Sequence, residues 1–361
     1  MEPQEIINRT IEFINNRDDS ETSFNEQALH LFAYQFRVNQ PYQQFCRQQG
    51  KTVRTVKSWR DIPAIPINAF KELTLSCEDP SQVERIFMTS GTTQGVKGNH
   101  YHPTLQVYDR SMIRNFKERF MNRTSSIRMG VLFPTEEEMP NSSLAHYLAL
   151  AVQEFGAEGS RYFIGQEGVQ VGPLIEALEK SENTGQPYAL MGATYSFIHL
   201  FDELERCGRR FSLPKGSKLL DTGGFKNQAR VMTLDGFYDL MHHYLGVPHS
   251  ACINMYGMTE LSSQFYDTGN ENVPSVKSGP HWTRTKVMNP LTGEEVPQGE
   301  RGILAHCDLA NFNSVSTILT EDVGVETEDG FLLLGRAEGA AAKGCSINVE
   351  EFIKATKGLS E

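Results

Sequence analysis

The chain has 361 residues, of which 39% are apolar and 22% are charged, and its formal net charge is −11. This length predicts two or three folding units, or one large domain with an appendage. The acidic balance argues against non-specific binding to nucleic acids or to anionic membranes, because both need basic surface patches. An anionic small ligand stays compatible with it, since a few local donors can hold one.

The sequence also gives expectations about cellular location. Its apolar runs fall short of the roughly 20 residues that cross a bilayer. The first ten residues, MEPQEIINRT, contain early acids and no apolar signal region. The six cysteines are scattered without a C-x-x-C pair, which is typical of reduced thiols. We therefore expect a cytoplasmic, enzyme-sized globular protein without a membrane span or a nucleic-acid partner.

Residues 1–80 are predicted to be mostly helical and to form a cover that is part of the main unit. The apolar residues between 6 and 14, and again between 29 and 36, lie close to helical spacing. Pro63 and Pro66 then force an extended passage.

Residues 81–275 alternate short β-type runs with amphipathic helices. The predicted strands are 84–88, 128–133, 161–164, 187–193, 217–224 and 251–257, and the clearest predicted helices are 105–120, 143–155 and 237–245. This alternation predicts an α/β core with a largely parallel sheet covered on both faces. In such sheets ligands bind where loops leave the carboxyl ends of the strands. Residues 276–361 are rich in turns and short strands, which predicts a small β-rich subdomain.

The segment TSGTTQGVKG (89–98) follows the first of these runs and is rich in hydroxyl and backbone N–H donors. Its glycines let the backbone approach an anion, and its hydroxyls can donate to phosphate oxygens. Lys97 adds a positive charge. The spacing fits neither the P-loop nor the dinucleotide fingerprint, and an exposed turn is the alternative interpretation.

A second segment, YGMTE (256–260), follows the last predicted strand of the core. Tyr256 can stack on a base, Thr259 can donate to a phosphate, and Glu260 can hold Mg²⁺, which prefers oxygen ligands shared with substrate phosphates. The alternative is a helix start, with Thr259 as its cap and Glu260 near its positive end.

Three weaker signals follow other predicted strands. Gly223 and Gly224 in DTGGFK leave room for a flat ring, although a plain tight turn has the same composition. Asp322, expected on a loop in LTEDVG, can accept hydrogen bonds from ribose hydroxyls, or is a surface acid. Arg336 and Lys343 flank a small, glycine- and alanine-rich stretch.

Taken together, these segments resemble the N-terminal domain of the adenylate-forming enzymes, which include acyl-CoA synthetases, firefly luciferase and peptide-synthetase adenylation domains. The resemblance covers roughly residues 60 to 350 and looks nearest to the acyl-protein synthetases of bacterial bioluminescence. It implies an α/β fold with mostly parallel sheets flanked by helices and a small β-rich C-terminal subdomain. Because the printed sequence ends soon after Gly344, the resemblance also implies that the family's mobile C-terminal lid and its lysine are absent.

The resemblance assigns roles to individual positions. The phosphate loop is Thr89, Ser90, Gly91, Thr92, Thr93, Gly95 and Lys97, and the adenine side is Gly223, Gly224, Tyr256 and Gly257. Thr259 and Glu260 would bind phosphate and magnesium, Asp322 the ribose, and Arg336 the region of the ribose and the hinge. The catalytic set is Lys97, Thr259, Glu260 and Cys345.

The implied activity is the ATP- and Mg²⁺-dependent activation of a fatty or aryl acid to an acyl-adenylate. The acyl group would then pass to a thiol, either Cys345 or a thiol of a partner such as a reductase or carrier protein. Cys345 is equally compatible with a small buried structural residue. The alternatives are an acyl-CoA ligase that uses coenzyme A and a separate lid, and a non-catalytic protein that binds acyl groups or nucleotides.

Overall fold

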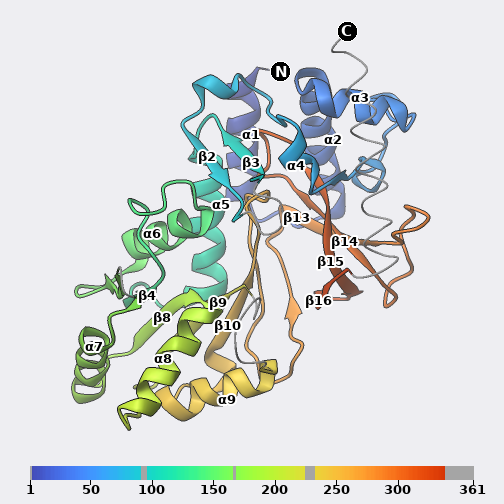
Figure 1. Cartoon of the computed structure of the whole chain (residues 1–361). Helices are drawn as coiled ribbons and strands as arrows, with labels where there is room; N and C mark the ends of the chain where they lie inside the picture. The colour runs from blue at the N-terminus through green and yellow to red at the C-terminus, as the bar shows by residue number, and fades with distance from the viewer. Residues whose placement is uncertain (1, 91–95, 166–167, 224–231, 338–361) are drawn as a thin grey trace. The chain divides into compact units, whose positions relative to one another are not determined.

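The computed structural model describes residues 2–90, 96–165, 168–223 and 232–337 (Figure 1). The chain divides into two compact units. Unit 1 comprises residues 1–114, 258–264 and 278–361, and unit 2 comprises residues 115–257 and 265–277. These units are defined by spatial contacts, whereas the boundaries expected near residues 80 and 275 were placed at changes in composition. The two expected boundaries therefore stay a prediction.

Unit 2 contains a sheet with the strand order β11-β10-β9-β8-β4-β5. All neighbouring pairs are parallel except β10 with β11, which is antiparallel. The bounds are β4 (Arg128–Leu132), β5 (Arg161–Tyr162), β8 (Tyr188–Ala193), β9 (Lys218–Thr222), β10 (Cys252–Tyr256) and β11 (Phe265–Tyr266). The predicted, largely parallel sheet is therefore confirmed, and all its strands except β11 coincide with runs chosen from the sequence.

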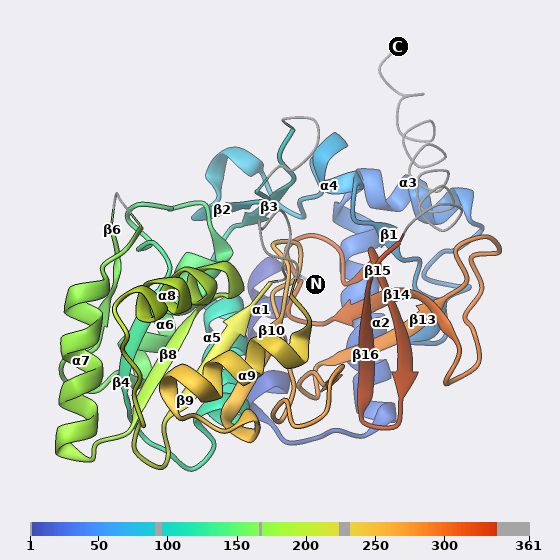
Figure 2. The same ribbon diagram turned by 60° about the horizontal axis from the view of Figure 1, so that its bottom comes forward.

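Helices lie on both faces of this sheet, as the alternation predicts. In Figure 1, α6 lies above the strands while α8 and α9 lie below them, and Figure 2 shows α8 and α9 in front of β8 and β9. Leu190 of β8 packs in one core with Phe197 and Phe237. On the other face, Phe116 stacks on Phe155 at 5.5 Å between ring centroids. The helices of unit 2 are a π-helix (Lys117–Met121), α6 (Ser143–Phe155), α7 (Val171–Thr184), α8 (Thr194–Arg206) and α9 (Leu234–Leu245). The π-helix continues α5 (Gln106–Phe116), most of which belongs to unit 1.

Unit 1 combines N-terminal helices with an antiparallel sheet. The helices are α1 (Pro3–Asn15), α2 (Glu21–Val38), α3 (Gln40–Gln48) and the short α4 (Ala69–Glu72). The strands β13 (Thr283–Met288), β14 (Arg301–Asp308), β15 (Thr317–Thr327) and β16 (Gly330–Arg336) pair in sequence, and β1 (Ile65–Pro66) runs parallel to β15. The expected β-rich character of the C-terminal part is thus present in its described residues. In the described parts of the chain, no helix has the length and apolarity that crossing a membrane requires.

One predicted strand belongs elsewhere than expected. The run at 84–88 forms β2 (Arg85–Met88), which pairs antiparallel with β3 (Asn99–His102) in a separate hairpin and not in the parallel sheet. The physical reason is the short connection: a parallel partner needs a crossover of about a dozen residues or more, usually a helix. The segment 89–98 is therefore the loop of a hairpin.

Leu190→Ala tests the core of unit 2. Leu190 is fully buried, so we expect this change to lower the free energy of unfolding by about 2–5 kcal/mol, measured by urea denaturation. Leu234→Ala is the matched control, because Leu234 is 41% exposed and should change it by less than about 0.5 kcal/mol. Equal effects of the two substitutions would contradict this account of the core.

Candidate functional site

The hairpin of β2 and β3 closes the base of the predicted phosphate loop. The backbone N–H of Thr89 donates to the carbonyl of Gly98 at 3.0 Å, and the N–H of Gly98 donates to the Thr89 hydroxyl at 2.9 Å. A Cβ at Gly98 would lie 3.3 Å from Thr89 Cγ2, so the Thr89 side chain would have to shift slightly to admit a larger residue at position 98. Ser90 and Lys97 are exposed at the two ends of the loop. The predicted residues Gly91, Thr92, Thr93 and Gly95 lie outside the described residues.

His100 connects this hairpin to the YGMTE segment. Its Nδ1 lies 2.9 Å from the backbone oxygen of Thr259, and its Nε2 lies 3.1 Å from both Asn313 Nδ2 and Ser314 Oγ. Complete burial lowers the pKa of His100 to about 4, so the imidazole is neutral. Because a carbonyl can only accept, Nδ1 carries the proton and Nε2 accepts. Strand β3 therefore holds the backbone of Thr259 in place.

Residues 257–264 form turns, and the alternative of a helix starting at Thr259 is not observed. The carboxylate of Asp308, at the end of β14, holds this segment. Its Oδ2 accepts from the N–H groups of Ser262 and Ser263 at 3.0 and 2.8 Å, and its Oδ1 accepts from the Ser263 hydroxyl at 2.8 Å. Asn311 Nδ2 donates to the carbonyl of Glu260 at 2.8 Å. Side chains beyond β14 thus supply the bonds that a helix would have provided.

The Glu260 side chain is buried, with 4% of its surface exposed. Burial raises the pKa of this carboxyl to about 7, and the charges of Lys71 and Arg336 oppose the rise. Among the described residues no group of three or more His, Cys, Asp or Glu side chains could hold a metal ion. Mg²⁺ commonly binds through one or two carboxylates, with substrate phosphates and waters completing its coordination. This donor set therefore fits a Mg²⁺ ion that arrives with a phosphate substrate, and does not form a metal cage.

Asp322 and Arg336 are brought together as cross-strand partners of β15 and β16. Arg336 Nε lies 3.5 Å from Asp322 Oδ1, and Arg336 Nη1 donates to Glu321 Oε2 at 3.1 Å. The expectation that Asp322 lies on a loop was wrong. The segment TILTEDVGVET pairs along β14, so its central acid extends from a strand. Arg336 is half exposed, and the ion pair contributes little stability by itself.

In unit 2, β9 and β10 are neighbouring parallel strands, and the residues predicted to border adenine lie at their carboxyl ends. Thr222 at the end of β9 is in register with Met255 of β10, and its hydroxyl donates to the Met255 carbonyl at 2.9 Å. Gly223 follows with a φ of +88°, a left-handed conformation that favours glycine. Tyr256 ends β10 and is largely buried, with its ring 5.9 Å from that of Phe265. Gly257 is exposed, and Gly224 lies outside the described residues.

Sequence reasoning missed several residues that hold these segments. His100, Asp308 and Asn254 were not assigned roles, although Asp308 lies at the carboxyl end of a strand. Asn254 donates through its Nδ2 to Asp221 Oδ2 at 2.8 Å. The place of Asp308 at the end of β14 is the one such signal for these three residues, because their partners are distant along the chain.

The described cysteines divide clearly by exposure. Cys46, Cys77, Cys252 and Cys307 are buried, whereas Cys207 is exposed at the end of α8. Burial raises the pKa of all four buried thiols, which disfavours the nucleophilic thiolate. Lys343 and Cys345 lie outside the described residues.

Comparison with known proteins places this geometry in a family. Residues 3–354 match the family described as acyl-protein synthetase, LuxE. The chain is 21% identical over 334 residues to a long-chain-fatty-acid–luciferin-component ligase of Vibrio harveyi, covering 90% of this chain and 86% of the relative. Its counterpart from Aliivibrio fischeri is 20% identical over 356 residues, covering 92% and 91%.

Solved structures show the same fold. A 2-hydroxyisobutyryl-CoA ligase in the postadenylation state superposes with a TM-score of 0.63 at 13% identity, covering 91% of this chain and 72% of that one. ATP-bound MatB from Rhodopseudomonas palustris superposes with a TM-score of 0.51 at 17% identity, covering 72% of this chain and 49% of its own. The predicted α/β fold of adenylate-forming ligases is therefore confirmed. The match over residues 3–354 confirms the predicted resemblance as well, and the chain belongs to the acyl-protein synthetase, LuxE, family of ligases.

Proposed function

We propose that this protein activates a long-chain fatty acid with ATP and Mg²⁺ and transfers the acyl group to a thiol. The two curated relatives carry the long-chain fatty acid in their names, and the family match supports acid–thiol ligation. The structural observation that carries the proposal is Glu260. It is a buried carboxylate on a turn that His100 and Asp308 hold in place, in the same unit as a hydroxyl-rich hairpin loop.

The first step joins the acid to AMP. A carboxylate oxygen of the acid attacks the α-phosphorus of ATP, the bond from this phosphorus to the bridging oxygen breaks, and pyrophosphate leaves with the electron pair. The protein has to position two anions and offset the charge that develops on pyrophosphate. We assign this task to the loop from Thr89 to Lys97 and to Thr259. Glu260 would hold Mg²⁺, which supplies further positive charge at the phosphates when it is bound.

Residues of unit 2 are proposed to take the adenine base. Gly223, Gly224 and Gly257 would leave room for the flat ring, and Tyr256 would contact it. We add Asn254 to this set. Its Nδ2 is committed to Asp221, so its Oδ1 is the amide atom left to accept a hydrogen bond from an amino group of the base. In unit 1, Asp322 would accept from the ribose hydroxyls, with Arg336 holding its carboxylate.

The second step transfers the acyl group to sulfur. A thiolate attacks the carbonyl carbon of the acyl-adenylate, the bond from this carbon to the AMP oxygen breaks, and AMP leaves. We propose Cys345 as the acceptor in the protein itself, because burial raises the pKa of four of the other cysteines. A partner protein, such as a reductase or carrier, would then receive the acyl group. Coenzyme A as the thiol is the alternative.

The proposal predicts ATP–pyrophosphate exchange that depends on an added acid. We expect exchange with long-chain fatty acids to exceed exchange with short-chain and aryl acids in a panel of both. Addition of coenzyme A should not increase AMP formation beyond one turnover of self-acylation. Absence of exchange with every acid, together with absence of ATP binding by calorimetry, would refute the proposal.

Glu260→Gln tests the magnesium ligand. We expect Mg²⁺-dependent exchange to fall about 10- to 100-fold, as is common for changes at metal ligands and their supports. At limiting Mg²⁺, exchange by the unchanged protein should decline as pH falls below about 7, because burial raises the pKa of Glu260 and protons then compete with the ion for its carboxylate. Glu328→Gln, at an exposed turn of the same unit, is the control and should retain full activity. A pH profile of Glu260→Gln that equals that of the unchanged protein would contradict the assignment.

Cys345→Ser tests the acceptor. With ATP and labelled fatty acid, we expect the protein to acquire a thioester label that hydroxylamine removes and that Cys345→Ser does not acquire. ATP–pyrophosphate exchange should persist in this variant, since adenylation precedes transfer. Cys207→Ser is the matched control, because Cys207 is the exposed cysteine among the described residues. Persistent label in Cys345→Ser, or its loss in Cys207→Ser, would move the acceptor elsewhere.

A further inference from the structure

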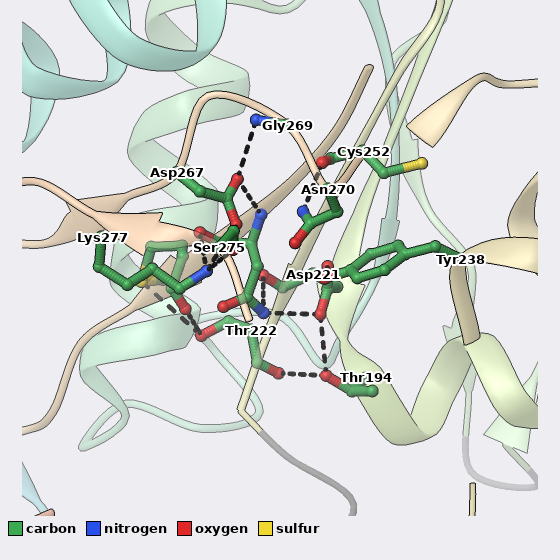
Figure 3. A network of polar contacts seen from close by, with 12 residues as sticks. Thr194, Asp221, Thr222, Tyr238, Cys252, Asp267, Gly269, Asn270, Ser275 and Lys277 are labelled. Carbon is green, nitrogen blue, oxygen red and sulfur yellow. Dashed lines mark hydrogen bonds and ion pairs between the residues drawn. The ribbon is translucent and has the colours of Figure 1, made fainter. Parts of the chain in front are cut away.

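A buried polar network lies at the ends of β9 and β10 in unit 2 (Figure 3). Its charged members are Asp221 in β9, Asp267 after β11 and Lys277, and their exposed fractions are 2%, 2% and 4%. A buried charge is costly unless its hydrogen bonds are satisfied. Replacement of a buried ion pair by apolar residues is often neutral for stability, so such a network contributes little net stability by itself. Its effect lies in the groups that it holds in position.

Asp221 accepts hydrogen bonds from three uncharged donors on three different elements. Its Oδ2 lies 2.8 Å from Asn254 Nδ2 of β10 and 3.2 Å from the Thr194 hydroxyl at the start of α8. Its Oδ1 lies 3.2 Å from the Tyr238 hydroxyl of α9. Figure 3 shows Thr194 and Tyr238 approaching Asp221 from these two helices. The Thr194 hydroxyl also lies 3.1 Å from the carbonyl of Thr222, so its single proton is shared between this carbonyl and the Asp221 carboxylate.

The other two charged groups hold the backbone of Asn254. Its N–H donates to Asp267 Oδ1 at 3.0 Å, and Lys277 Nζ lies 3.4 Å from its carbonyl oxygen. Lys277 pairs with Asp267 at 2.5 Å, and the Ser275 hydroxyl donates to the same carboxylate at 2.7 Å. Asn254 is thus fixed at its N–H, its carbonyl and its side-chain NH₂ group.

The chemistry of a carboxylate determines which way the Asn254 amide faces. An ionised carboxylate has acceptors only, so the amide must present its NH₂ group to Asp221 and its oxygen to the other side. An apolar side chain at position 221 would remove the nearer acceptor of the Asn254 NH₂ group, at 2.8 Å, and leave only the backbone oxygen of residue 221 at 3.4 Å. The amide could then rotate by half a turn. Rotation would replace an acceptor by a donor at the atom that faces away from Asp221.

We propose that Asp221 is a positioning residue for nucleotide selection, which fixes Asn254 Oδ1 as an acceptor and thereby favours a purine with a 6-amino group over one with a 6-oxo group. This inference rests on the proposed function, in which Asn254 faces the base. The 6-amino group of adenine donates to such an acceptor, whereas the 6-oxo group of hypoxanthine faces it with a second acceptor. The selection acts through Asn254, and Asp221 itself touches no substrate.

The test compares ATP with ITP in the full chain. Affinities for both nucleotides are measured by calorimetry, and KM and kcat by acid-dependent pyrophosphate exchange. In the unchanged protein we expect ATP to bind about tenfold or more tightly than ITP, equivalent to one lost hydrogen bond. In Asp221→Leu, which has a similar shape without the acceptors, we expect this ratio to fall to about one through weaker ATP binding, with kcat at saturation changed less than about threefold.

Tyr238→Phe is the matched control. It removes one donor to Asp221 but leaves the carboxylate and its bond to Asn254, so it should lower the free energy of unfolding while keeping the ATP-to-ITP ratio. If Asp221→Leu does not fold, Asp221→Ser replaces it, because serine is too short to reach Asn254 yet stays polar.

Three outcomes would overturn the inference. The first is an unchanged ATP-to-ITP affinity ratio in folded Asp221→Leu or Asp221→Ser. The second is an equal loss of affinity for ATP and ITP in that variant. The third is an ATP-to-ITP ratio near one in Tyr238→Phe. Failure of the unchanged protein to bind either nucleotide would instead refute the proposed function, so the two failures are distinguishable.

Discussion

The carboxylate of Asp308 is the constraint on which the candidate site of unit 1 depends. Residues 258–264 have no regular secondary structure, so their backbone N–H groups need partners outside a helix or sheet. Asp308 accepts from the backbone of Ser262 and Ser263, and it is itself held at the end of β14. Burial raises the pKa of Asp308 to about 6, yet these donors favour its ionised form. Without this carboxylate the turn carrying Thr259 and Glu260 would keep only the bonds from His100 and Asn311.

In unit 2, buried carboxylates also hold the residues at the ends of strands. Asp221 near the end of β9 and Asp267 just after β11 are buried carboxylates. They fix Asn254, two residues before Tyr256, as Asp308 fixes Ser262 and Ser263 after Glu260. In both units the cost of burying an acid is offset by donors from several elements. Loops at strand ends are free to vary in conformation, and a buried carboxylate with several donors is one way to make such an end rigid. Rigid ends suit a reaction in which the protein mainly positions two anions.

The sequence predicted the parts of this structure that depend on local pattern. Regular alternation of apolar strands and amphipathic helices located β4, β8, β9 and β10 and predicted their parallel pairing. It failed for β2, because a run of five residues carries no information about its partner, and for Asp322, whose strand was read as a loop from its acids and glycine. Glu260 was identified as a candidate from its motif, but its burial depends on tertiary packing. The partners of Asp308 and Asp221 could not be predicted at all, since the residues that meet there are tens of positions apart in the chain.

Under the proposed function, the burial of Glu260 would let a single carboxylate serve a metal ion that arrives with the nucleotide. In the free protein, desolvation raises the pKa of this group, so near neutral pH a proton can occupy the place of a cation. A Mg²⁺ ion carried by ATP would displace that proton, because a divalent charge stabilises the ionised form far more strongly than Lys71 or Arg336 do. Without the phosphates the ion would lack most of its oxygen ligands. Under the proposal, Glu260 would therefore make metal binding depend on nucleotide binding.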